Sequence, residues 1–461
     1  MKKSFKITLT LFLLVFLQAF QLSLGQAVLT ADELLGLKRG YVYDLKPDGT
    51  ELIYSVLTPR GPNEEPGPAH REYFRMNLPG NASSPLFDDG IKGSSPRYSP
   101  DGSLIAFLYK KEEGHTQVWA IPAEGGDMVQ LTRADNDVSY YRFHPDGQGI
   151  AYLSREPETE REIELEKRGY GFIFYEENLK NNRLFTTRFD EDLNPGPEKQ
   201  LLRGTHVWNF EFSPDGQWLA FSSSEKNLID HRYMFRELQI LDMSTGEVVM
   251  EVGNEGKLGN YAFNEEGTHL AFASALNIND HAVSQAYTYS LEEETITNHT
   301  PVDYRGHVEW VGWKSDKELM YYAGEGVYPK LYSLSLKKGK RTMMLDSRAS
   351  GIIFGTPLFT PDLELFVFTG NTPYDPSNFY TWDGKGDLTK ISDLNPGLSD
   401  NVFGRQEVIR YEARDGTEIE GLLIKPVGYE EGKKYPLILY VHGGPEAHHS
   451  NGWLSSNVSH R

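Results

Sequence analysis

The chain has 461 residues, enough for two or three domains, and 39% of them are hydrophobic, which leaves ample material for buried cores. Its net charge of −20 argues against a nucleic-acid partner, because no basic surface is available to bind phosphates. The lack of cysteine in the sequence excludes disulfides, thiolate catalysis and cysteine-based zinc sites.

The N-terminus has the pattern of a secretory signal peptide. Three lysines precede an apolar run at residues 7–17, and small residues lie just before an expected cleavage site ahead of Gln26. An apolar run of this length is too short to span roughly 30 Å of hydrocarbon. We therefore expect residues 1–25 to be removed and the mature protein to be exported, to the periplasm or the extracellular space, without a membrane span.

A ten-residue pattern then recurs seven times. Its clearest copies, at 98–107, 143–152 and 212–221, contain Pro-Asp-Gly followed by an apolar run. Weaker copies lie at 45–54, 263–272, 313–322 and 359–368. The last position is aromatic in every copy: Tyr54, Phe107, Tyr152, Phe221, Phe272, Tyr322 and Phe368.

The spacing of these copies predicts a β-propeller. Their third positions fall at 47, 100, 145, 214, 265, 315 and 361, so the period is near 50 residues. Such a period, with short strands and turn signals, is typical of propeller blades of about four strands. Runs that are apolar on both faces suit strands sandwiched between neighbouring blades. We predict a mostly β protein with a seven-bladed β-propeller over residues 26–404.

The aspartates of the repeats favour turns over calcium sites. Pro presets φ, Asp bonds locally and Gly accepts positive φ, which together make a tight turn. Calcium needs six to eight oxygen ligands, whereas each copy offers one carboxylate. No metal site or cofactor is expected.

The interval between the third and fourth copies, from position 145 to position 214, is unusually long. It contains a charged stretch at 156–168 that is typical of a solvated helix or excursion. Two adjacent carboxylates follow, Glu176 and Glu177, which could bind the N-terminal amine of a peptide substrate. The alternative is that they belong to a solvated loop.

After the propeller the pattern changes to that of an α/β sheet. Residues 408–411 and 419–425 predict a hairpin around the turn at Asp415-Gly416. Residues 437–441 predict a buried strand, which leads into His442-Gly443-Gly444-Pro445. A turn after such a strand can donate backbone N–H groups to an oxyanion, so Gly443 and Gly444 are oxyanion-hole candidates. We expect residues 405–453 to be the first part of an α/β-hydrolase domain.

This combination resembles the prolyl oligopeptidase family of serine peptidases. The matching segments after the propeller are 415–421 and 434–445, and the His-Gly-Gly-Pro turn is characteristic of the acylaminoacyl-peptidase-like branch. The resemblance covers residues 30 to 453. It implies a two-domain enzyme in which the propeller caps the hydrolase site and admits only short peptides. It also implies a Ser-Asp-His triad and no cofactor.

The catalytic serine of that family is not found. Gly-x-Ser-x-Gly occurs nowhere in the 461 residues, and the triad would be expected beyond residue 453. We therefore expect an incomplete chain that is inactive alone, has no catalytic residue and ends in an unstructured or aberrant tail at 454–461. His442 is expected to pack or hydrogen-bond at the strand end, and uncovered strands are expected to promote association.

Two alternatives stay open. The first is an exported propeller similar to that of TolB, which binds partners or acts as a scaffold without catalysis. The hairpin and glycine turn at 406–445 favour the peptidase, because a binding propeller has no need of them. The second keeps the peptidase but gives it dipeptidyl-peptidase specificity through Glu176 and Glu177.

Overall fold

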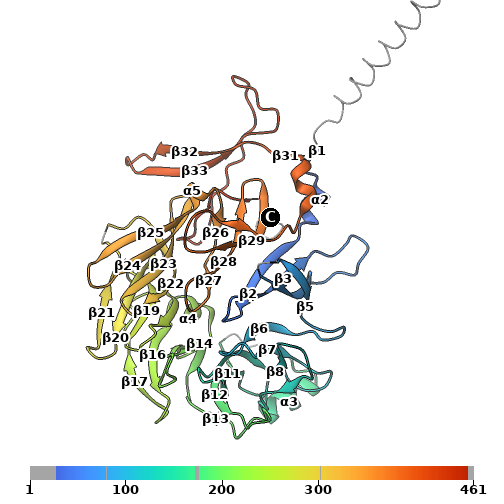
Figure 1. Cartoon of the computed structure of the whole chain (residues 1–461), viewed down its shortest axis with the longest axis vertical. Coiled ribbons are helices and arrows are strands. Elements are labelled where there is room, and N and C mark those ends of the chain that lie inside the picture. The colour runs from blue at the N-terminus through green and yellow to red at the C-terminus, as the bar shows by residue number, and fades with distance from the viewer. Residues whose placement is uncertain (1–26, 79, 172–175, 302, 455–461) are drawn as a thin grey trace, which may run out of the picture.

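Seven β-sheets form the blades of a ring (Figure 1). The computed structural model describes residues 27–78, 80–171, 176–301 and 303–454. Strands take 45% of the structure and helices 6%, so the predicted mostly β, seven-bladed propeller is confirmed. The expected signal peptide and residues 455–461 of the expected tail lie outside the described residues, and the domain boundaries at 25, 404 and 453 stay predictions.

The first six blades each contain four antiparallel strands in chain order, with the first strand nearest the axis of the ring. Blade 1 comprises β2 (Arg39–Leu45), β3 (Glu51–Thr58), β4 (His70–Asn77) and β5 (Ala82–Pro85). Blade 2 comprises β6 (Ser94–Tyr98), β7 (Leu104–Tyr109), β8 (Gln117–Pro122) and β9 (Val129–Gln130). Blade 3 comprises β10 (Val138–Phe143), β11 (Gly149–Arg155), β12 (Asn182–Arg188) and β13 (Lys199–Gln200). Blade 4 comprises β14 (His206–Phe212), β15 (Trp218–Ser224), β16 (Glu237–Asp242) and β17 (Glu247–Glu251). Blade 5 comprises β18 (Leu258–Phe263), β19 (His269–Ala275), β20 (Ser284–Ser290) and β21 (Thr295–Asn298). Blade 6 comprises β22 (His307–Ser315), β23 (Glu318–Glu325), β24 (Tyr328–Ser335) and β25 (Lys340–Asp346).

Blade 7 differs because its inner strand is split into two short pieces that both pair with the second strand. It comprises β26 (Ile353–Phe354), β27 (Leu358–Phe359), β28 (Phe366–Thr372), β29 (Asp375–Trp382) and β30 (Thr389–Lys390). The remaining elements are β1 (Ala27–Val28), α2 (Ala31–Leu35), α3 (Glu160–Lys167), α4 (Ile229–Tyr233), α5 (Ser347–Ser350), the 3-10 helix η1 (Pro396–Asp400), β31 (Asn401–Val402), β32 (Gln406–Glu412) and β33 (Glu418–Ile424).

The repeat supplies the first turn and the second strand of each blade. In five copies the aspartate Oδ1 accepts the backbone N–H two residues later, as Asp101 does from Ser103 at 3.0 Å. The turn glycines adopt positive φ, for example +72° at Gly102. The predicted role of these aspartates in turns is therefore confirmed. The seven aromatic residues that end the copies are all buried, at 0–6% exposure.

The core consists of layers between blades rather than one central cluster. The described residues form seven hydrophobic clusters, and each joins two neighbouring blades. Phe210 and Phe221 of blade 4, for example, pack with Leu153 and Leu184 of blade 3. Both faces of an inner strand are thus apolar, as the runs in the sequence predicted.

The ring closes without exchange of a strand between its first and last blades. All strands of blade 1 and all strands of blade 7 come from continuous segments. Leu52 and Tyr54 of blade 1 pack against Val367 and Phe379 of blade 7. Asn395 exchanges two hydrogen bonds of 2.9 Å with the backbone of Lys38 beside this interface. Parallel pairing of β1 with β31 adds a second short link.

The predicted hairpin is confirmed, but the predicted strand after it is wrong. β32 and β33 pair over their full lengths across the turn at Asp415-Gly416. Residues 437–441 form no strand and are highly exposed, with Ile438 at 92%. A strand exists only where neighbouring strands satisfy its N–H and C=O groups. In the part of the chain that the structure describes, no such neighbour lies beside this run.

The long interval in blade 3 holds the exposed helix α3, as its charge pattern predicted. Thr159 and Glu162 form a capping box at its start. Lys180 binds Glu162 at 2.6 Å and so ties the helix to the segment that precedes β12. The 18-residue apolar helix that a membrane span would need is not found among the described helices.

His206 links blades 3 and 4 and is only 1% exposed. Its Nδ1 accepts the backbone N–H of Asn182, at the start of β12, at 3.0 Å. The proton of the neutral ring therefore lies on Nε2, which is buried and has no partner among the described atoms. Burial lowers the pKa of His206 to about 4.

Acid should therefore destabilise the propeller through His206. Since an unfolded histidine has a pKa of about 6.5, the unfolded chain binds the proton first, and stability falls below about pH 6.5 until about pH 4. Between about pH 7.5 and pH 5 this residue should remove ~2 kcal/mol. We expect His206→Gln to lose less stability over this interval than the wild type, measured by urea unfolding. The exposed His281→Gln is the control, and an unchanged pH dependence in His206→Gln would contradict the argument.

Candidate functional site

One face of the propeller contacts the residues that follow the glycine turn. Because the strands of a blade are antiparallel, the connections between second and third strands all emerge on the face opposite the Pro-Asp-Gly turns. Residues 446–453 contact that face at the connections of blades 5 and 6 and at the end of β28 in blade 7. We call residues 446–453 the docked segment. It follows the glycine turn directly.

Gly443 and Gly444 are exposed and keep their amides free. Within the described ranges, neither backbone N–H donates a hydrogen bond. Gly444 has φ +151°, and a Cβ there would meet the backbone N of Ala447. At Gly443 the space around a Cβ is open. Unpaired N–H groups can serve as oxyanion donors where they point at one oxygen, and only a desolvated site makes such donors strong.

The docked segment begins with an ion-pair cluster. Lys257, just before β18, donates to both carboxylate oxygens of Glu446 at 2.9 Å and also pairs with Asp280 at 2.7 Å. The side chains of Lys257 and Glu446 are only 14% and 19% exposed. Burial alone would lower the pKa of Lys257, but the hydrogen bonds to Asp280 and Glu446 raise it above its ordinary value.

His448 fills a space that only glycine leaves open. Its ring lies so close to Gly324, in β23, that a Cβ on this glycine would overlap it. Its Nε2 is 4.0 Å from Glu309, in β22. Burial, followed by the charges of neighbouring histidines, lowers the pKa of His448, and burial raises that of Glu309. Both shifts disfavour charge at this contact.

Backbone hydrogen bonds complete the docking. The N–H of Asn451 donates to the carbonyl of Val327 at 2.8 Å, and its side chain donates to the hydroxyl of Tyr328 at 2.8 Å. The N–H of Trp453 donates to Asn371 Oδ1 at 2.8 Å. Gln406, at the start of β32, donates to Asn451 Oδ1 at 2.9 Å. The docked segment is therefore fixed to the propeller and to the hairpin.

The histidines near the turn serve packing. His442 lies edge-on to His449, with ring centroids 5.7 Å apart, and its Nδ1 is 3.3 Å from the carbonyl oxygen of Gly443. His449 also packs against Tyr440. Burial lowers the pKa of His449. His442 is exposed and residues 437–441 form no strand, so its expected role at a strand end stays a prediction.

Glu176 and Glu177 are exposed and lie in the connection between β11 and β12. This connection emerges on the same face as the docked segment, but α3 and β12 lie across the ring from β32 and β33 (Figure 1). No described contact joins either glutamate to residues 442–453. Both glutamates thus lie on the propeller face that the docked segment contacts, but the structure does not bring them to the glycine turn.

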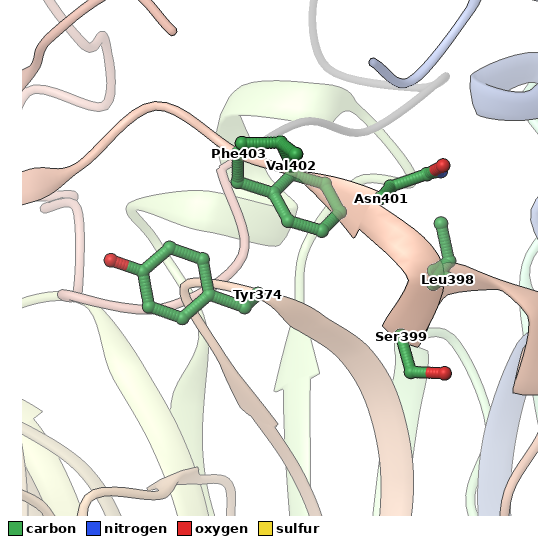
Figure 2. A pocket seen from close by; sticks show the side chains of 6 residues that line it. All are labelled: Tyr374, Leu398, Ser399, Asn401, Val402 and Phe403. Carbon is green, nitrogen blue, oxygen red and sulfur yellow. The ribbon is translucent and has the colours of Figure 1, made fainter. Parts of the chain in front are cut away.

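A small cavity lies beside the link between blade 7 and the hairpin (Figure 2). Its volume is about 280 Å³, and its lining is Tyr374, Leu398, Ser399, Asn401, Val402 and Phe403. No charged side chain lines it, and drug-sized ligands occupy sites of roughly 300–1,000 Å³. The cavity is therefore a poor peptide site. Phe403 packs edge-on against Trp453, which connects this region to the docked segment.

The sequence did not indicate the propeller residues that hold the segment. Lys257, Asp280, Glu309 and Asn371 belong to no motif, and Lys257 lies 189 positions from Glu446 in the chain. No grouping of three or more His, Cys, Asp or Glu side chains suited to a metal ion occurs among the described residues.

Comparisons with known proteins agree with the fold. No protein-family model matches the chain. It is 24% identical to dipeptidyl-peptidase 5 of Porphyromonas endodontalis over 93% of this chain and 64% of that protein. It is 23% identical to the uncharacterized peptidase YuxL of Bacillus subtilis over 91% of this chain and 66% of that protein. The chain therefore spans just under two thirds of these relatives.

Among solved structures, the chain is similar to an acylaminoacyl peptidase in complex with Z-Gly-Gly-Phe-chloromethyl ketone. The TM-score is 0.65 at 17% identity, over 92% of this chain and 63% of that one. At this identity the likeness concerns the fold. Together these comparisons support the resemblance to propeller-containing peptidases of the prolyl oligopeptidase family.

Replacement of Gly324 by alanine should loosen the docked segment. The new Cβ would overlap the His448 ring, and such overpacking typically costs 1–3 kcal/mol. We expect faster hydrogen exchange at residues 446–453, measured by mass spectrometry, with little change in the inner strands. Gly61→Ala, where a Cβ meets open space, is the control. Equal exchange in Gly324→Ala and wild type would show that His448 is not held there.

Proposed function

We propose that this chain carries the propeller and the oxyanion turn of an exported serine peptidase of the prolyl oligopeptidase family that cleaves short peptides. The observation that carries the proposal is the pair of free amides at Gly443 and Gly444, directly before the segment that is docked to one propeller face. The peptidase relatives support the substrate class. The pattern of the first 25 residues supports export.

The chemistry assigned to the turn is stabilisation of a tetrahedral intermediate. When a nucleophile attacks a peptide carbonyl, negative charge develops on the oxygen, and two N–H donors aimed at it lower the barrier. Removal of one such donor typically costs 10²–10³ in rate. The propeller face that binds the docked segment would restrict access to the glycine turn, so that only short or unfolded peptides could reach it.

The hairpin favours this function over that of a binding scaffold. β32 and β33 continue from blade 7 and pair with each other, and their outer faces leave Tyr411 and Ile424 about half exposed. A scaffold propeller has no need of such a hairpin outside its ring. In an α/β-hydrolase such a hairpin begins the sheet that carries the catalytic residues.

Dipeptidyl-peptidase specificity is the second candidate. Several relatives bear the name dipeptidyl-peptidase 5, and removal of a dipeptide requires recognition of a free N-terminus. Glu176 and Glu177 are two adjacent exposed carboxylates on the same propeller face as the docked segment. A carboxylate pair can bind an ammonium group by charge-assisted hydrogen bonds.

The 461-residue polypeptide should not hydrolyse peptides by itself. It contains no Gly-x-Ser-x-Gly elbow, and an oxyanion hole without a nucleophile provides no covalent route. We expect neither turnover of chromogenic peptides nor labelling by a fluorophosphonate, with trypsin as the positive control. Turnover that the fluorophosphonate blocks would refute this expectation.

The same polypeptide should nevertheless bind short peptides through its propeller face. A tripeptide with a free amine should bind about 5-fold more tightly than its N-acetylated form, as expected for one exposed ion pair of ~1 kcal/mol. Glu176→Gln with Glu177→Gln should remove this difference in a calorimetric titration. The matched control is Glu164→Gln with Glu166→Gln, on the exposed helix α3. If neither peptide binds, the peptide-binding role is wrong; if the difference persists, the glutamates do not select the amine.

A further inference from the structure

The ion-pair cluster at the start of the docked segment lies very close to the glycine turn in sequence. Glu446 follows Gly444 by two residues and Gly443 by three. Three residues span at most about 11 Å, so the pair with Lys257 confines both amides to a small region above blade 5. Pro445, whose ring fixes its φ, is the only residue between Gly444 and Glu446. Little freedom is left between the ion pair and the turn.

We propose that Lys257 is a positioning residue that holds the Gly443–Gly444 turn in place through Glu446. The inference rests on the proposed function, because the turn needs a fixed position only if its amides serve as oxyanion donors. It adds a role for the propeller: blade 5 contributes to the geometry of the oxyanion hole as well as to the exclusion of large substrates.

The surroundings of Lys257 fit this role. Its ammonium group binds both oxygens of Glu446, and Asp280 supplies a second carboxylate from the connection between β19 and β20. The positive charge is thus shared between a fixed partner on the propeller and one on the segment. Because the Lys257 and Glu446 side chains are at most 19% exposed, solvent and salt weaken their attraction less than that of a surface pair.

The contacts farther along the segment cannot replace this ion pair at the turn. His448 is held against Gly324, and Asn451 is held by Val327. These sites lie four and seven residues after Gly444, so they leave the turn several residues of freedom. Of the described contacts between the segment and the propeller, the ion pair of Lys257 with Glu446 is therefore the one nearest the turn.

The test is amide exchange in the 461-residue chain. Lys257→Met should speed exchange at residues 446–453 by roughly 5-fold, as expected for loss of one partly buried ion pair. The amide of Asn451, which donates to Val327, reports whether the segment stays docked when the ion pair is lost. Lys257→Arg, which keeps the charge, should restore slow exchange. Lys314→Met is the matched control, because Lys314 pairs with Glu318 within blade 6 at 3.2 Å.

Glu446→Gln provides the second variant, since it changes the segment and leaves blade 5 intact. It should speed exchange as much as Lys257→Met, and the double variant should be no faster than either single one. Unchanged exchange in Glu446→Gln, or no rescue by Lys257→Arg, would overturn the proposal. Exchange at Asn451 requires no peptide, so failure of this inference is distinguishable from failure of peptide binding.

Discussion

The structure depends on how a ring of seven blades closes without a shared strand. Each interface between blades is held by side-chain packing, and the interface between blades 1 and 7 has the same character as the other six. Since no ladder of backbone hydrogen bonds joins the first and last sheets, the fit of Tyr54 against Phe379 and the Asn395 bonds to Lys38 carry the closure. This requirement explains why every copy of the repeat ends in a buried aromatic residue.

The docked segment adds a second constraint on the same ring. It contacts Lys257 in blade 5, Val327 in blade 6 and Asn371 in blade 7, so a single stretch of eight residues bridges three neighbouring blades on one face. Relative movement of these blades would break hydrogen bonds in the segment. The glycine turn and the propeller are thus mechanically linked, and Gln406 extends this link to the hairpin.

The fold was largely predictable from the sequence, whereas the site was predictable only in part. The spacing of the repeats, the turn residues and the apolar runs are local signals, and they predicted the blades, the hairpin and the exposed helix α3. Gly443 and Gly444 could be named as candidates because a turn after an apolar run is also a local signal, and their role stays a prediction. Lys257 and Gly324 were missed because they contact Glu446 and His448, which lie more than a hundred positions away, and because the role of Gly324 depends on the absence of a side chain. Asp280 was missed because its role depends on the pair of Lys257 with Glu446. The run at 437–441 was predicted as a strand from its composition alone, but composition supplies apolar side chains and not the partners for a ladder.

The exposed run and the free amides follow from one physical cause. Residues 437–441 lack neighbouring strands among the described residues, so water satisfies their backbone groups and also reaches Gly443 and Gly444. A hydrogen bond donated in water is worth only ~1 kcal/mol net, because the donor exchanges one partner for another. The same donor in a dry site contributes several times more to a developing oxyanion. Position and desolvation are therefore separate requirements for the oxyanion role that we propose for this turn. The ion pair of Lys257 and Glu446 addresses position, while desolvation requires that the apolar run at 437–441 be covered.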